Sequence, residues 1–284
     1  MSTLEATAPS APSAPSAPVR RRERRSLGSY VLPTYTWLVI LYTVIPIAVM
    51  IAYSFNQAPA GRLTFHWSGF TTQWYSQAFD ISDLTGALEH SLVVAVASTA
   101  ISVLIGTPLA LALARHRFRG RTTTDAVIFT DIAAPEVVVG ASLLSLFITL
   151  GVSRGIGTII IAHVAFSVAF VVVVVRARVV GLDRSIEKAA YDLGAGPWTT
   201  FRLITLPLIA PGIFAGALLA FAMSIDDFII TEFVAGQTLT FPLWVYGAVK
   251  VGIPPQVFVM GTLIFVAGII LALVNTFMQR RTSL

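Results

Sequence analysis

Acidic side chains interrupt an apolar stretch at residues 212–235, where Asp226 and Asp227 follow its midpoint and Glu232 lies nearer its C-terminal end. A carboxylate at the centre of a membrane helix costs about 2.5 to 3.5 kcal/mol on insertion scales, so each of these groups needs a role. Two kinds of chemistry fit. The carboxylates could attract a cation along a transport path, or they could bind backbone groups at a helix distortion or a neighbouring subunit.

Small and polar side chains follow one face of the same stretch at spacings of four, four, three and four residues: Gly216, Ala220, Ser224, Asp227 and Thr231. Small residues permit close helix contact, so this face is expected to meet protein or a water-filled path instead of lipid. Asp226 is rotated from Asp227 by about 100° and is expected at the edge of this face.

A second pair of acids, Asp131 and Glu136, flanks Pro135 in the apolar stretch 126–150. Proline removes a backbone donor, so we expect a bend there. Asp131 is expected to be solvated or paired with a nearby arginine-rich loop, whereas Glu136 could add to the negative field of a transport path. The candidate residues of that path are Asp226, Asp227, Glu136, Ser224, Thr231 and Glu232.

The sequence lacks the residues that several kinds of catalysis require. The chain has no cysteine, and its four histidines, at 66, 90, 116 and 163, show no metal-ligand spacing. His163 is instead expected to form hydrogen bonds that join neighbouring helices. The only lysines, Lys188 and Lys250, follow Glu187 and Val249, so no phosphate-binding Gly-Lys-Ser/Thr loop exists. We therefore predict no catalytic residue, no metal, no cofactor and no enzymatic activity.

The elements that carry these residues are predicted to be membrane-spanning helices. Hydrophobic residues make up 56% of the 284 positions and charged residues 12%, with a mean hydropathy of +0.81. Apolar runs near the length that a helix needs to cross the bilayer, roughly 20 residues, occupy 37–55, 92–114, 126–150, 159–175, 212–235 and 257–277. The prediction is an all-α, polytopic protein with six transmembrane helices.

Basic residues set the expected orientation. Of 19 Lys and Arg residues, 16 fall before the first run, in the loops after the second and fourth runs, or at the C-terminus. Since basic loops stay inside the cell, both termini are expected in the cytoplasm. Residues 1–30 are expected to form a disordered Ala/Pro/Ser tail with a basic juxtamembrane segment that faces anionic lipid and no nucleic acid, and residues 31–284 to form the permease domain.

The segment 183–211 has helical composition although it lies between two spans. Ser185 is expected to cap a first short helix, Gly194 to end it in the left-handed conformation, and Pro197 to open a second helix. Such a hairpin would expose apolar residues to the cytoplasm, which predicts a protein partner; lying flat on the membrane is the alternative.

The pattern in this segment resembles the EAA signature of binding-protein-dependent ABC importer permeases, which implies the type I permease fold. The matching positions are Ala189, Ala190, Gly194, Ile204, Leu206 and Pro207, while Lys188 stands where glutamate is usual and Glu187 precedes it. The resemblance implies that these eight residues couple the membrane domain to a cytoplasmic ATPase, which binds ATP and Mg²⁺.

Other strings are similar to spermidine/putrescine permeases, particularly the C-type subunit: Tyr-Ser-Phe-Asn at 53–56, Pro-Glu-Val-Val-Val-Gly at 135–140, Ser-Ile-Asp-Asp at 224–227 and Phe-Pro-Leu at 241–243. The resemblance implies a polyamine importer in a bacterial inner membrane, with a second permease subunit, two ATPase subunits and an extracytoplasmic substrate-binding protein. A permease for another small solute, and a secondary transporter or cation channel using the acids of 212–235, remain alternatives.

Overall fold

The computed structural model describes residues 28–58 and 66–282, so most of the expected tail, residues 1–27, lies outside the described residues. The described residues form α-helices and no strand. In chain order the helices are α1 (Gly28–Ser54), α2 (Gln73–Ser76), α3 (Ser82–Arg115), α4 (Arg121–Ala133), α5 (Glu136–Thr149), α6 (Ile156–Val180), α7 (Ser185–Asp192), α8 (Pro197–Thr200), a π-helical turn (Phe201–Thr205), α9 (Leu206–Asp226), α10 (Ile229–Val234), α11 (Phe241–Val251) and α12 (Pro255–Thr282).

Five helical segments in the described chain are long and apolar enough to cross a membrane, and a sixth span is present if α4 and α5 count as one. The expected all-α, multi-pass fold is therefore confirmed. The bend expected at Pro135 is confirmed, but the stretch 126–150 is broken into two helices and not merely bent, because α4 and α5 meet at an angle of 107°. Ala134 is extended, with ψ 134°, since the ring of Pro135 excludes the helical conformation from the residue before it.

The helix expected at 212–235 is also interrupted. Helix α9 ends at Asp226, Asp227 has an extended backbone with ψ 123°, and α10 begins at Ile229. The acidic pair therefore lies at a break between two helices instead of inside a continuous one.

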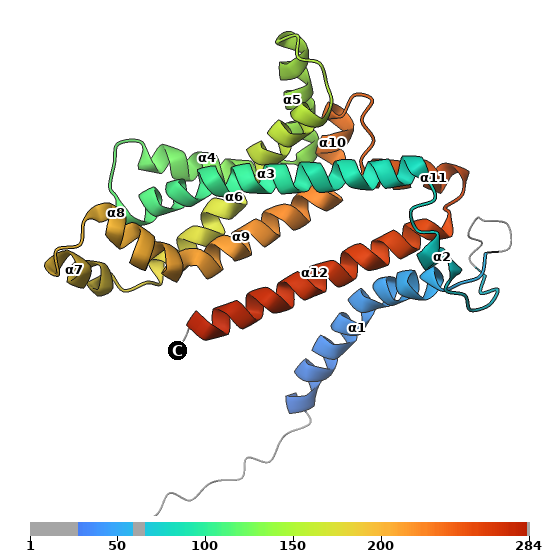
Figure 1. The fold of residues 1–284 in the computed structure, drawn as a ribbon, viewed down its shortest axis with the longest axis horizontal. Helices are drawn as coiled ribbons and strands as arrows, with labels where there is room; N and C mark the ends of the chain where they lie inside the picture. Colours follow the sequence, from blue (N-terminus) through green and yellow to red (C-terminus); the bar gives the residue numbers. More distant parts are fainter. Residues whose placement is uncertain (1–27, 59–65, 283–284) are drawn as a thin grey trace, which may run out of the picture. The chain divides into compact units, whose positions relative to one another are not determined.

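The chain divides between Ala48 and Val49 into two units, and the features below belong to the second. Its core forms where α3, α6 and α9 run side by side (Figure 1). Small residues allow this approach, because a Cβ on Gly106 of α3 would lie 2.9 Å from Cγ1 of Val171 of α6. The predicted small face of α9 is buried as expected, at Gly216, Ala220 and Ser224.

Candidate functional site

The hairpin of α7 and α8 lies at one end of this unit (Figure 1). Helix α7 begins at Ser185, so the expected cap is the first helical residue; the N-cap position is Arg184, whose side chain makes no capping bond, and Asp183 before it binds Ser185. Asp183 accepts hydrogen bonds from the hydroxyl of Ser185 at 2.6 Å and from its backbone N–H at 2.8 Å. These bonds hold the pKa of Asp183 below its usual range, so a negative charge faces the positive start of the helix.

The turn after α7 follows from one glycine. Gly194 has φ +83°, and its N–H donates to the carbonyl of Tyr191 while the N–H of Ala195 donates to that of Ala190. Together these two bonds form a Schellman motif, which satisfies carbonyls at the helix end and needs a left-handed residue. Gly196 is extended and Pro197 opens α8, as the sequence predicted.

Large apolar side chains on the hairpin are exposed. Leu193 is 89% exposed and Trp198 is 70% exposed, with Ile186 at 44%. Burying a Leu side chain stabilises a protein by about 1.5 to 3 kcal/mol, so these groups offer unused free energy to a binding partner. The hairpin thus leaves these apolar side chains uncovered by its own bundle.

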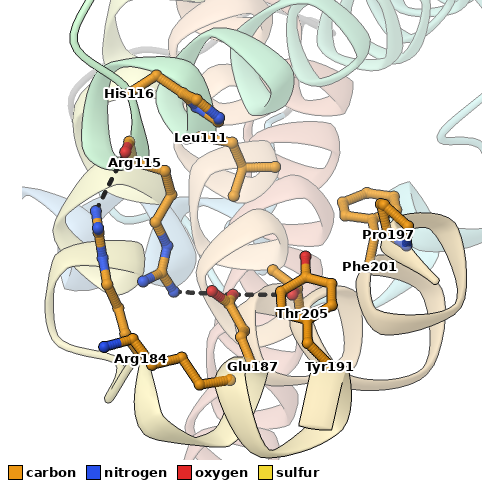
Figure 2. A pocket seen from close by; sticks show the side chains of 10 residues that line it. Leu111, Arg115, His116, Arg184, Glu187, Tyr191, Pro197, Phe201 and Thr205 are labelled. Atoms are coloured by element: carbon orange, nitrogen blue, oxygen red, sulfur yellow. Dashed lines mark hydrogen bonds and ion pairs between the residues drawn. The ribbon is translucent and has the colours of Figure 1, made fainter. Parts of the chain in front are cut away.

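The eight EAA-like residues divide between the exposed surface and the bundle. Lys188, Ala189, Gly194 and Pro207 are exposed, Ala190 is buried, and Glu187, Ile204 and Leu206 are half-buried. The side chain of Glu187 points towards α3 (Figure 2). Its Oε1 accepts hydrogen bonds from Nη2 of Arg115 in α3 at 3.0 Å and from Oγ1 of Thr205 in the π-helical turn at 2.9 Å.

These contacts border a cavity of about 400 Å³ between the hairpin and the end of α3 (Figure 2). Arg184 also connects the hairpin to the end of α3, because its Nη2 donates to the carbonyl oxygens of Ala114 at 3.2 Å and Arg115 at 3.3 Å. Sequence reasoning missed Arg115, which it counted only as one charge in a basic loop. Its 72-residue separation from Glu187 leaves no local signal.

The second group of site residues lies at the break between α9 and α10. The carboxylate of Asp227 accepts from the backbone N–H of Thr231 at 2.8 Å, from the hydroxyl of Thr231 at 2.6 Å and from the N–H of Ile230 at 3.4 Å. Nε2 of His163 lies 3.2 Å from the same carboxylate. Asp227 therefore caps the start of α10, which is the structural alternative raised from the sequence.

His163 joins these helices, as the sequence predicted. Its Nδ1 lies 2.7 Å from Oγ of Ser224, and its Nε2 lies 2.9 Å from Oγ1 of Thr231. Ser98 of α3 donates to Ser224 at 3.1 Å. One assignment satisfies this chain: each serine hydroxyl donates towards His163, and the Nε2–H of a neutral His163 donates towards Thr231 and Asp227.

Asp226 differs from its neighbour in exposure. It is exposed whereas Asp227 is buried, and both line a cavity of about 520 Å³ together with Glu136, Phe166 and Phe228, among others. Asp226 and Glu136 therefore both place a carboxylate on the surface of this cavity. Carboxylates beside aromatic rings form a favourable environment for an ammonium group. Glu232 is exposed on α10 and does not line this cavity.

Apolar spanning helices, a broken helix at an acid-lined cavity and an exposed helical hairpin together define a multi-pass membrane protein of all-helical architecture. The chain belongs to the family described as "Binding-protein-dependent transport system inner membrane component", whose model matches residues 106–284.

Curated relatives cover most of the chain. It is 38% identical to the spermidine/putrescine transport system permease protein PotC of Escherichia coli K12 over 243 residues, 85% of this chain and 91% of the relative. It is also 38% identical to the putrescine transport system permease protein PotI of the same organism, over 84% of this chain and 86% of the relative.

Solved structures share the fold at lower identity. A chain of a bacterial ABC transporter involved in the import of the acidic polysaccharide alginate matches with a TM-score of 0.63 and 19% identity, over 93% of this chain and 99% of that chain. The alginate transporter in complex with a periplasmic protein bound to an alginate pentasaccharide matches with a TM-score of 0.60 and 18% identity, over 90% and 94%.

Proposed function

We propose that this chain is a permease subunit of an ATP-driven ABC importer for polyamines in a bacterial inner membrane. The observation that carries the proposal is the cavity where Asp226 and Glu136 meet aromatic rings at a helix break. A polyamine is a flexible cation with methylene segments between its amines, so it needs both negative charge and apolar surface. The names of PotC and PotI support the same substrate class.

The hairpin supports an external motor. With Leu193 and Trp198 exposed, it offers a docking surface to a cytoplasmic ATPase, which would bind ATP and Mg²⁺ while this chain performs no covalent chemistry. In this assembly the chain pairs with a second permease subunit, two ATPase subunits and an extracytoplasmic binding protein. Both termini and the hairpin then lie on the cytoplasmic side, in agreement with the basic loops.

The test is transport by the purified assembly in liposomes with the binding protein on one side and ATP on the other. We expect uptake of labelled spermidine or putrescine that requires ATP, and ATPase activity that rises with loaded binding protein. Polyamine uptake that needs no ATP and stops with a proton uncoupler would support a secondary transporter instead. ATP-driven uptake of another solute alone would overturn the substrate class.

The two adjacent aspartates give a separate prediction, because they have different partners. Asp226→Asn should raise the KM for polyamine about tenfold, the effect of losing about 1.4 kcal/mol of attraction, with normal assembly. Asp227→Asn should instead lower the amount of folded protein, since Ile230 and Thr231 donate to different carboxylate oxygens and the amide sets its NH2 against one of these two N–H groups.

Uptake kinetics and the yield of assembled complex, measured on the same preparations, check this prediction. Glu232→Gln is the matched control, because Glu232 is an exposed acid of the same region outside the cavity lining. Equal KM values for Asp226→Asn and the unaltered protein would remove Asp226 from the path.

A further inference from the structure

We propose that Glu187 is a positioning residue that fastens the hairpin to α3, so that α3 carries the motion of the hairpin into the bundle. This inference rests on the proposed function, because it concerns how work done on the hairpin reaches the transport path. Covalently, the hairpin continues into α6 at one end and into α9 at the other. Helix α3 is separated from it in sequence and needs a noncovalent link.

One carboxylate oxygen makes the ion-pair part of that link, beside the bonds from Arg184 to the carbonyl oxygens of Ala114 and Arg115. Oε1 of Glu187 accepts from Arg115, the last residue of α3, and from Thr205 in the π-helical turn (Figure 2). One side chain thus joins α7, α3 and the turn that leads into α9. π-Helical turns often lie at functional sites. This one connects the hairpin to α9, so a contact that fixes it sets the angle between the hairpin and α9.

The pair is partly withdrawn from water. The side chain of Arg115 is 12% exposed and that of Glu187 is 21% exposed. A charge pair in such a place is weakly screened by salt, and removing one partner leaves the other desolvated. In the described residues, Nε of Arg115 is already buried without a partner, so Glu187 supplies the hydrogen-bonded contact that its guanidinium makes.

Helix α3 runs from Arg115 at its C-terminal end past the break between α9 and α10. It has 34 residues, which corresponds to a length of about 51 Å. Ser98, near its middle, donates to Ser224 in the chain of bonds that ends at Asp227. Near its N-terminal end, His90 bonds the carbonyl of Leu239 and Ser91 accepts from the N–H of Phe241. A displacement of Arg115 therefore acts on the helix that contacts the break between α9 and α10.

Neighbouring charges on α7 serve as controls. Lys188 and Asp192 are exposed, and neither forms an ion pair with any residue that the structure describes. Asp192→Ala removes a carboxylate of the same helix without touching the link. Glu187→Gln keeps the size of the side chain and an oxygen that can accept from Arg115 and Thr205, so it separates loss of charge from loss of contact.

The test is a double-mutant cycle in the complete transporter in liposomes, with polyamine moved per ATP hydrolysed as the readout. We expect Glu187→Ala and Arg115→Ala each to lower this ratio about tenfold, within the span that coupling between two sites covers, and the double variant to be no worse than either single one. Glu187→Gln should fall between, and Asp192→Ala should match the unaltered protein.

The outcomes distinguish the two proposals. If the unaltered complex hydrolyses ATP without moving polyamine, the proposed function fails before the variants are compared. If it transports normally and Glu187→Ala keeps the same ratio, the link through α3 is wrong. Additive losses in the double variant would also overturn it, because removing Arg115 from a chain that already lacks Glu187 breaks no further part of the proposed link. Equal yields of assembled complex exclude a folding defect, and a low yield of Glu187→Ala leaves Glu187→Gln to decide.

Discussion

Replacing Gly194 by valine should leave the protein in the membrane and uncouple ATP hydrolysis from uptake. Gly194 has φ +83°, a conformation that costs an L-residue about 1 to 2 kcal/mol, and a β-branched side chain pays at the upper end. No heavy atom lies within 4 Å of an added Cβ, so the strain falls on the backbone of the turn and not on packing.

Relief of this strain requires the turn to leave the left-handed conformation, which breaks the bonds from Gly194 and Ala195 to the last carbonyls of α7. Helix α8 and the exposed Trp198 would then point elsewhere. We expect polyamine uptake per ATP to fall at least about 50-fold, towards the upper part of the range of coupling energies in proteins.

Gly196→Val is the matched control, two residues along the same exposed turn. Gly196 has φ −71° and ψ 164°, which valine adopts readily, and an added Cβ there also meets no neighbour. Uptake and ATPase rates measured side by side decide the result. Normal uptake in Gly194→Val, or an equal loss in Gly196→Val, would contradict the proposed role of the left-handed turn.

The second large effect is expected at His163. In His163→Leu, Ser224 and Thr231 lose a partner and Asp227 loses a nearby donor, all in a buried region. Thr231 and Asp227 stay bonded to each other, but the hydroxyl of Ser224 loses its acceptor, and a buried polar group left unpaired costs about 1 to 3 kcal/mol. We therefore expect uptake to fall at least about tenfold.

His163→Gln should restore part of that activity, because its amide offers an oxygen to the hydroxyl of Ser224 and an N–H to Thr231 and Asp227, the same pattern as a neutral imidazole. His66→Leu changes an exposed histidine and should have no effect. Uptake rate and thermal stability of the purified complex are the measurements. Wild-type uptake in His163→Leu, or no difference between its Leu and Gln variants, would contradict this account.

Local patterns in the sequence predicted much of this arrangement. Apolar runs predicted the spans, and the residue types at Gly194 and Pro197 predicted a hairpin because turn chemistry is decided within a few residues. The burial of the small face of α9 followed from its spacing.

Features set by distant contacts were not predictable in the same way. The spacing placed Asp227 on the small face and Asp226 at its edge, but it gave no sign that His163 and Thr231 bind Asp227 and not Asp226. The proline at 135 predicted a bend, whereas its angle of 107° depends on what α4 and α5 pack against. The Glu187 and Arg115 contact joins residues with no shared local pattern.

His163 lies beside the carboxylate of Asp227, and Ser98 bonds Ser224 nearby. Both precede Asp227 in the chain, which bears on how the protein is made. Ser98 and His163 belong to α3 and α6, so both leave the ribosome before α9 and α10. This buried carboxylate thus enters the bilayer when His163 of α6 has already been inserted. A fragment starting after α6 would have to insert the same acid with the donors of α10 alone, and the native order of synthesis avoids that barrier.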